Sequence, residues 1–193
     1  WGGGGVVGGW GGGGGVGGGW ELIKHRGPDV QKYVIYEHNG KYIAFAHARL
    51  SIIDLSDAAI QPFESKCKQY SIIFNGEIYN YQEIRQELKS LGVSFYTDSD
   101  TEVLLAAWQQ WGIQVLTKLI GMFAFAIFDK IANKVTLVRD AFGIKPFFYN
   151  FERENLFFGS DIRAVTALIG KKSQPNLQKA YDYLVHGDYD SSD

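Results

Sequence analysis

The side chains best suited to chemistry stand where apolar runs of this 193-residue sequence end. Asn75, Gly76 and Glu77 follow a β-branched and aromatic run. An Asn amide and an unobstructed Gly N–H at such a place can point at one acceptor, which is what stabilisation of an oxyanion requires. Asn-Gly is also a strong hairpin signal, so a plain turn is the alternative interpretation.

A guanidinium and two acids extend the candidate set. Arg49 begins an apolar run, where a guanidinium needs a partner or an anion such as a carboxylate, or else an exposed place on an edge strand. His47 is interpreted as a packing histidine, because spacing assigns it no Ser or Cys nucleophile. Asp100 and Glu102 fit the first turn of a helix, with a ligand ammonium as the alternative partner.

Two further features have ordinary explanations. The segment 25–29, His-Arg-Gly-Pro-Asp, has the composition of a turn. Cys67 is the single cysteine, so the chain forms no internal disulfide and no cysteine zinc site, and a reducing, cytoplasmic setting is expected. Its neighbours Lys66 and Lys68 could lower the thiol pKa, but Ser-Lys-Cys-Lys is typical of a surface turn.

The elements that must position these groups are mostly strands, interrupted by two helices. Asn39-Gly40 predicts a hairpin, and Ser99 with Glu102 predicts a helix start. The predicted strands are 32–37, 41–46, 50–54, 69–74, 122–129, 134–139, 146–151 and 156–159, and the predicted helices are 81–91, 101–111, 161–169 and 177–185.

This order lacks regular alternation of strand and helix. It therefore predicts an α+β fold of two antiparallel sheets flanked by helices, a four-layer α-β-β-α sandwich. A composition of 46% hydrophobic and 21% charged residues with a net charge of −2 fits about one globular domain. It argues against bulk nucleic-acid binding, and the absence of a long aliphatic run argues against membrane insertion.

The first 20 residues differ from the rest. They hold 14 of the 24 glycines and 3 of the 5 tryptophans, and they carry no charge. Glycine loses the most backbone entropy on folding and buries no side chain, so disorder is expected unless a partner strand captures the segment.

Taken together, several segments of the chain resemble the glutaminase domain of asparagine synthetases. The similar segments are 25–29, 47–56, 61–63, 74–81, 99–102, 121–126 and 139–146, in family order, and the resemblance covers about residues 21–193. It implies an Ntn-hydrolase sandwich and a class II glutamine amidotransferase. Predicted divisions are 1–20, aberrant or disordered; 21–175, the amidotransferase domain; and 176–193, a helix and the start of a linker to a synthetase domain.

The resemblance also implies a mechanism. An N-terminal cysteine attacks the glutamine amide with its own α-amine as base, ammonia leaves, and a glutamyl thioester is hydrolysed. Asn75 and the Gly76 N–H would hold the oxyanion, and Arg49 the substrate α-carboxylate. The α-ammonium would meet Asp100 and Glu77, while the backbone at Ile52 and Ile53 would line the pocket.

The chain departs from the family pattern at its beginning. The family starts Cys-Gly-x-x-Gly, whereas this sequence starts Trp1-Gly-Gly-Gly-Gly, so Trp1 stands where the nucleophile is expected. The family's first strand and first helix are expected to be missing, and an inactive chain is predicted. The alternative is a non-catalytic glutamine-binding or interaction module. No cofactor is expected in this domain, with ATP and Mg assigned to the synthetase domain; L-glutamine, that domain and a homodimer are the expected partners.

Overall fold

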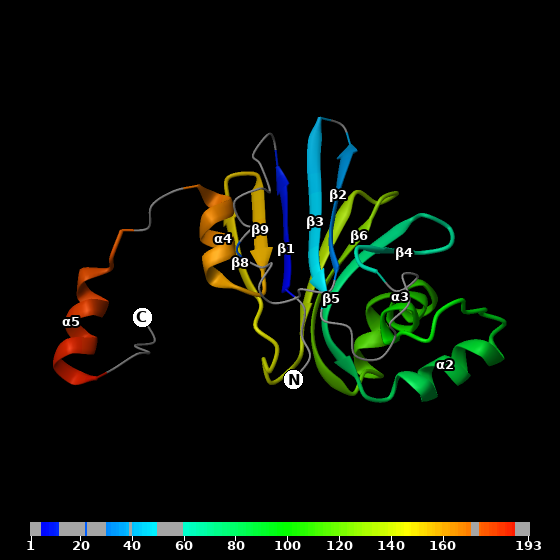
Figure 1. Ribbon diagram of the computed structural model, residues 1–193. Coiled ribbons are helices and arrows are strands. Elements are labelled where there is room, and N and C mark those ends of the chain that lie inside the picture. The colour runs from blue at the N-terminus through cyan, green and yellow to red at the C-terminus, as the bar shows by residue number, and fades with distance from the viewer. Residues whose placement is uncertain are drawn as a thin grey trace.

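The computed structural model describes residues 5–11, 22, 30–38, 40–49, 60–170 and 174–187. Two antiparallel sheets lie face to face, with helices on their outer sides (Figure 1). The elements are β1 (Gly5–Gly11), β2 (Val30–His38), β3 (Lys41–Arg49), β4 (Phe63–Glu64), β5 (Tyr70–Ile78), α2 (Tyr81–Ser90), α3 (Asp100–Trp111), the 3-10 helix η3 (Gly112–Thr117), β6 (Gly121–Asp129), β7 (Lys134–Arg139), β8 (Phe148–Glu152), β9 (Asn155–Gly159), α4 (Ile162–Ile169) and α5 (Leu177–His186).

The larger sheet has the strand order β2-β3-β1-β9-β8. Its β2–β3 hairpin turns at Gly40, whose φ of 72° lies in the left-handed region, as the sequence pattern predicts. Between β3 and β9, strand β1 pairs with both of its neighbours, and Val6 stands opposite His47. The glycine-rich segment therefore contributes a central strand.

This central strand corrects one expectation. The prediction that the first strand is missing is wrong for Gly5–Gly11, because backbone hydrogen bonds on both edges hold a strand that has little side-chain surface. At Gly8 the lack of a side chain is itself required. A Cβ there would lie 2.5 Å from Cζ of Phe158 and 2.8 Å from the Ala44 carbonyl oxygen. The predicted domain boundaries stay predictions, and the expected absence of the first helix concerns a part of the chain that is almost entirely outside the described residues.

The smaller sheet has the order β4-β5-β6-β7 and corrects a second expectation. The predicted strand stops at Phe74, but β5 continues to Ile78, so Asn75 and Gly76 lie inside a strand rather than in a turn. Gly76 permits a close approach to β6, since a Cβ there would lie 2.2 Å from the Met122 carbonyl oxygen. Gly121 on β6 likewise permits the close approach of β5, because a Cβ at Gly121 would lie 2.2 Å from the Glu77 carbonyl oxygen.

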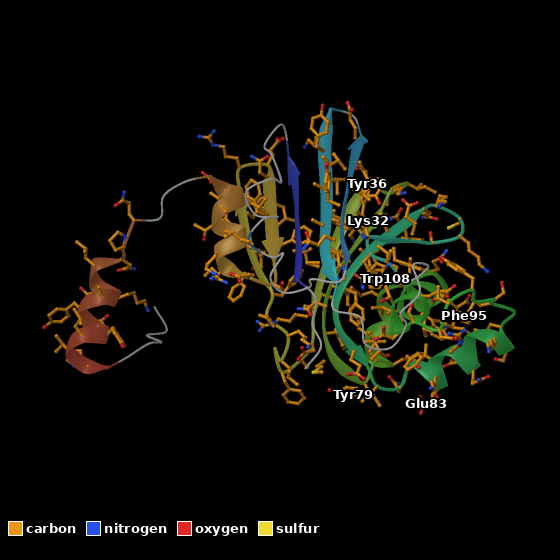
Figure 2. All side chains as sticks on the ribbon, in the orientation of Figure 1. Lys32, Tyr36, Tyr79, Glu83, Phe95 and Trp108 are labelled. Carbon is orange, nitrogen blue, oxygen red and sulfur yellow. The ribbon has the colours of Figure 1, made fainter. Side chains whose placement is uncertain are left out.

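The four predicted layers are confirmed by the packing. Between the sheets lies an apolar core of Ile43, Phe45, Ile73, Ala126, Phe128 and Phe158. Helices α2 and α3 cover the outer face of the smaller sheet, where Trp108, labelled in Figure 2, packs edge-on against Phe125 of β6 with ring centroids 6.2 Å apart. On the outer face of the larger sheet, Ala164 of α4 packs against Ala46 and Ala48.

A polar contact joins the two sheets at one edge. The hydroxyl of Tyr36, a β2 residue labelled in Figure 2, lies 2.8 Å from Ser71 Oγ on β5. It donates to Glu64 Oε1 at 3.2 Å. Burial is the main reason that the pKa of Tyr36 rises to about 12, so the hydroxyl stays protonated. Lys130, from the turn after β6, completes the cluster by pairing with Glu64.

Candidate functional site

Asn75 is the residue that marks a site between the sheets. Side chains alternate along a strand, so Asn75 shares the face of Ile73, which belongs to the core between the sheets. Only 1% of Asn75 is exposed, and neither Oδ1 nor Nδ2 has a hydrogen-bond partner among the described residues. Burying an unpaired amide costs about 1–3 kcal/mol. An amide kept at this cost is oriented for something other than the fold.

The backbone N–H of Gly76 is a second donor beside that amide. Phe74 N–H donates to Gln61 Oε1 at 2.6 Å, and Ile78 N–H donates to Asp100 Oδ2 at 3.1 Å, so both leave β5 on the edge away from β6. Because N–H groups alternate between the two edges of a strand, the Gly76 N–H leaves on that same edge. Within the described ranges, no residue there accepts a hydrogen bond from it.

Gln61 is a contributor that sequence reasoning missed. Its Oε1 accepts from Phe74 N–H, and its Nε2 donates to Thr101 Oγ1 at 3.3 Å, so it ties β5 to the first turn of α3. The segment 61–63 carries part of the family resemblance, but residue type alone gives a glutamine beside a proline no role. Gln61 is thus a buried amide whose oxygen and nitrogen are both hydrogen-bonded, unlike those of Asn75.

Two carboxylates lie at the end of β5. Asp100 is buried at the start of α3, and its Oδ2 holds the Ile78 N–H. Burial, together with the negative charge of Glu77, raises the pKa of Asp100 to about 6, although backbone N–H groups act in the opposite direction. Half-buried Glu77 precedes Ile78 on the strand. Two acids that repel each other in a partly closed place favour a cationic ligand.

Glu102 has a structural role instead. Ser99 caps α3 by accepting the Glu102 N–H at 3.2 Å, which confirms the predicted helix start. The Glu102 carboxylate accepts from the N–H and the hydroxyl of Thr97, each at 2.7 Å, and from the Tyr96 N–H. Its acceptor capacity is largely used by the loop before the helix, which leaves Asp100 as the acid available to a ligand.

The larger sheet supplies the opposite wall. His47 is buried on β3, on the face of Ile43 and Phe45 that meets the smaller sheet, and β5 contacts both β1 and β3. Arg49 is the last residue of β3, two residues after His47, and its side chain is outside the described part of the structure. Trp1, segment 25–29, Ile52 and Ile53 also lie outside the described residues.

A tightly bonded loop after β7 supports the site from the β6 side. The Asp140 carboxylate accepts the backbone N–H groups of Phe123, Phe142, Ile144 and Lys145 at 2.9–3.2 Å. These bonds outweigh the opposing effect of burial and lower the pKa of Asp140. Phe123 pairs with Gly76 across β5 and β6, so the loop fixes the strand next to the candidate donors.

Cys67 lies away from this site. It is exposed in the turn between β4 and β5, where Gln109 Nε2 donates to its Sγ at 3.1 Å. A hydrogen bond with Ser65 is the main cause of its lowered pKa. Tyr70, at the start of β5, is five residue steps from Asn75, or about 17 Å at the usual rise of a strand. The surface-turn interpretation of Cys67 is confirmed.

Among the described helices, none has the length and apolar character needed to cross a membrane. The arrangement of two stacked antiparallel sheets, with hydrogen-bond donors and acids at one end of their interface, defines the Ntn-hydrolase amidotransferase fold class. Two solved structures share it. The Bacillus subtilis glutamine phosphoribosylpyrophosphate amidotransferase, complexed with ADP and GMP, aligns with a TM-score of 0.71 at 21% identity, over 85% of this chain and 43% of that one. A structure of the allosteric regulatory enzyme of purine biosynthesis aligns with a TM-score of 0.70 over the same shares.

The chain belongs to the glutamine amidotransferase domain family, whose model matches residues 18–192. Glutamine-hydrolyzing asparagine synthetase 1 of Bacillus subtilis (strain 168) is 45% identical over 145 residues, which are 75% of this chain and 22% of that protein. A putative glutamine-hydrolyzing asparagine synthetase 2 of Methanocaldococcus jannaschii is 33% identical over 183 residues, 86% of this chain and 35% of that protein. The chain thus spans about a fifth to a third of these relatives.

Proposed function

We propose that this chain is the glutamine-binding domain of an asparagine synthetase, in which L-glutamine supplies ammonia for ATP-dependent synthesis of asparagine from aspartate. The observation that carries the proposal is a pair of donors beside a buried acid, Asn75 Nδ2 and the Gly76 N–H, neither of which has an acceptor among the described residues. In the attached synthetase domain, ATP and Mg would serve the second reaction. A cytoplasmic location and a homodimer belong to the same proposal.

The charged residues of the pocket would each bind the oppositely charged group of glutamine. Asp100 and Glu77 would hold the α-ammonium group of glutamine, because a bound cation relieves the repulsion between two neighbouring carboxylates. Arg49 would hold the α-carboxylate through a bidentate pair, and the backbone of Ile52 and Ile53 would close the pocket. These contacts would place the side-chain amide of glutamine against Asn75 and Gly76.

Hydrolysis would then proceed through a thioester. An N-terminal thiol, deprotonated by its own α-amine, would add to the amide carbon, and the oxyanion would receive hydrogen bonds from Asn75 Nδ2 and the Gly76 N–H. Collapse of this intermediate would break the C–N bond, and the nitrogen would leave as ammonia with the proton from the amine. Water would then release glutamate and regenerate the thiol.

Gly8 supports a different place for the nucleophile than residue 1. The family pattern Cys-Gly-x-x-Gly ends on a glycine four residues after the cysteine, and polyglycine allows several alignments. Gly8 is packed too tightly for any side chain, between Ala44 and Phe158. Aligning the last glycine of the pattern with Gly8 gives Gly5-Val6-Val7-Gly8 and assigns the nucleophile to position 4, which is glycine here. Position 4 is therefore our proposed nucleophile position, in place of Trp1.

Three polypeptides test the function and the position together. The 193-residue chain is expected to release no ammonia from glutamine, because its single thiol, Cys67, is remote from Asn75. A Gly4→Cys variant that begins at residue 4 is expected to release ammonia. The matched control is Trp1→Cys, which begins at residue 1 and is expected to be inactive. Activity in the control alone would overturn position 4, and activity in neither would overturn the glutaminase proposal.

A non-catalytic glutamine-binding module is the second candidate, and the remote place of the single thiol favours it for the sequence as printed. Calorimetric titration of the 193-residue chain with L-glutamine tests this candidate. Binding that is lost on Asp100→Asn and kept on the exposed-surface variant Gln109→Ala would support it. Heat signals that are absent in the parent chain would reject it.

A further inference from the structure

Two buried side chains flank the Gly76 N–H along one edge of β5. The N–H groups of Phe74, Gly76 and Ile78 all leave the strand on the edge away from β6. The first donates to Gln61 Oε1 at 2.6 Å, and the third donates to Asp100 Oδ2 at 3.1 Å. At the usual rise of a strand, the Gly76 nitrogen lies midway, about 7 Å from each of the other two nitrogens.

Gln61 stands where the ladder between β4 and β5 ends. Phe63 pairs with Ile72 in that ladder, and the same register places Gln61 opposite Phe74. At this position the Phe74 N–H is bonded by the side chain of Gln61. The ladder thus ends one N–H before Gly76, and an amide side chain makes the last bond on that edge.

The same side chain reaches the helix that carries the acid. The Phe74 N–H can only donate, so it fixes the oxygen of Gln61 toward β5 and leaves the amide nitrogen for Thr101 Oγ1, 3.3 Å away. Thr101 follows Asp100 in the first turn of α3. Gln61 and Thr101 are only 7% and 4% exposed, so water has little access to this bond. One buried amide therefore links β5 to the start of α3.

This link bears on the distance between two binding groups. Asn75 and Gly76 belong to β5, whereas Asp100 belongs to α3, so their spacing depends on how the start of α3 is held against the strand. In the proposed function, the amide oxygen of the ligand lies at the first group and its α-ammonium at the second. L-Asparagine is shorter than L-glutamine by one methylene between these two ends. A single methylene changes discrimination by about 10–200-fold in a fitted site.

We propose that Gln61 is a positioning residue that sets the spacing between the oxyanion donors and Asp100, and that this spacing selects L-glutamine over L-asparagine. The inference rests on the proposed function for the identity of the ligand. The positioning itself rests on the two hydrogen bonds of Gln61 and on the bond between Asp100 and Ile78.

Hydrogen exchange of the Ile78 amide tests the positioning without any enzyme assay. Its acceptor is Asp100 Oδ2, so its exchange rate reports whether the start of α3 stays on β5. In the 193-residue chain, Thr101→Val removes the acceptor of the Gln61 amide. Exchange of Ile78 relative to the amides of β6 is then expected to rise by at least about 10-fold, and Gln61→Leu is expected to act in the same way.

Two control variants separate positioning from a general loss of stability. Thr101→Ser keeps the hydroxyl and is expected to keep the parent ratio of exchange rates. Val115→Ala shortens a fully buried side chain of η3, outside this cluster. It is expected to change the amides of Ile78 and of β6 alike.

The selection is tested by the ratio of kcat/KM for L-glutamine to kcat/KM for L-asparagine. This ratio is measured in the Gly4→Cys chain that begins at residue 4. Thr101→Val is expected to lower it by about 10-fold, because a released helix start lets Asp100 meet the shorter ligand. Thr101→Ser and Val115→Ala are expected to keep it, since a loss of folded protein lowers both rates together.

Two results would overturn the proposal. Equal acceleration of the Ile78 and β6 amides in Thr101→Val and Gln61→Leu would make Gln61 a structural residue only. A parent-like ratio of glutamine to asparagine hydrolysis, with faster exchange at Ile78, would show that the spacing does not select the ligand. If the Gly4→Cys chain released no ammonia from glutamine, the proposed function would fail, and the exchange of Ile78 would still decide whether Gln61 positions Asp100.

Discussion

Replacing Asn75 with leucine is expected to stabilise the fold and to slow the proposed glutamine hydrolysis. Both polar atoms of the Asn75 side chain are buried without a partner among the described residues, so the folded state bears a desolvation cost that the unfolded chain avoids. Asn75→Leu keeps the branch at Cγ and the number of side-chain heavy atoms, and it removes that cost. The expected gain in unfolding free energy is about 1–3 kcal/mol. For a chain of this length, each kcal/mol corresponds to about 2–4 °C in Tm.

Gln61 provides a matched control for this gain. It is also a buried amide against β5, but its Oε1 and Nε2 are both hydrogen-bonded, to Phe74 N–H and Thr101 Oγ1. Gln61→Leu leaves two buried groups without partners and is expected to destabilise the chain by about 1–3 kcal/mol. The two substitutions are therefore expected to shift the urea midpoint in opposite directions.

The functional half of the prediction uses the Gly4→Cys chain that begins at residue 4. Removing one oxyanion donor costs about 10²–10³ in kcat, so Asn75→Leu is expected to lower ammonia release by that factor. Glutamine affinity is expected to change less. If Asn75→Leu destabilised the chain as strongly as Gln61→Leu, Asn75 would be a structural residue and the reasoning would be refuted.

Three further predictions concern charge and packing. The folded-state pKa of Asp100 is raised to about 6, above its unfolded value. This carboxyl therefore stabilises the fold below pH 4, and that stabilisation is lost as the pH rises through 6. Asp100→Asn is expected to stabilise the chain at pH 8 by up to about 3 kcal/mol in urea titrations, and not at pH 4. Glutamine binding measured by calorimetry is expected to weaken below pH 6, and a flat profile would contradict the role of ionised Asp100. Asp140 has a lowered pKa, so its contribution is present above pH 4 and lost at lower pH; Asp140→Asn is expected to destabilise the chain at pH 7 and to have little effect near pH 2, provided that the parent is still folded there. Gly8→Ala is expected to lower the free energy of unfolding by about 1–3 kcal/mol, and Tm with it, because the new Cβ would overlap Phe158. An unchanged Tm would exclude the close packing of β1.

Local signals in the sequence predicted most elements correctly. The hairpin at Gly40 and the cap at Ser99 depend on a few neighbouring residues, so short-range rules were sufficient. The turn alternative for Asn75-Gly76 was wrong because Gly76 serves a contact with β6, which is distant in sequence. A rule based on φ preferences has no information about such a contact.

Composition does not predict that the segment of β1 forms a strand. Its glycines carry no β propensity, and entropy alone predicts disorder. Pairing with β3 and β9 on both edges depends on strands more than 30 and more than 140 residues away, and the place of Gly8 depends on Phe158. Tertiary contacts therefore decided the structure of this segment.

The candidate site divides in the same way. The sequence by itself determined the chemical inventory: an amide beside a glycine, a helix-start acid and an arginine at the start of an apolar run, in segments that resemble the amidotransferase family. Only the tertiary structure decided that the Asn75 amide is buried without a partner among the described residues and that the Gly76 N–H leaves β5 on the edge away from β6. It also decided that burial and the charge of Glu77 raise the pKa of Asp100. Desolvation and hydrogen-bond partners come from residues far apart in the chain, and so these properties arise only when the two sheets meet.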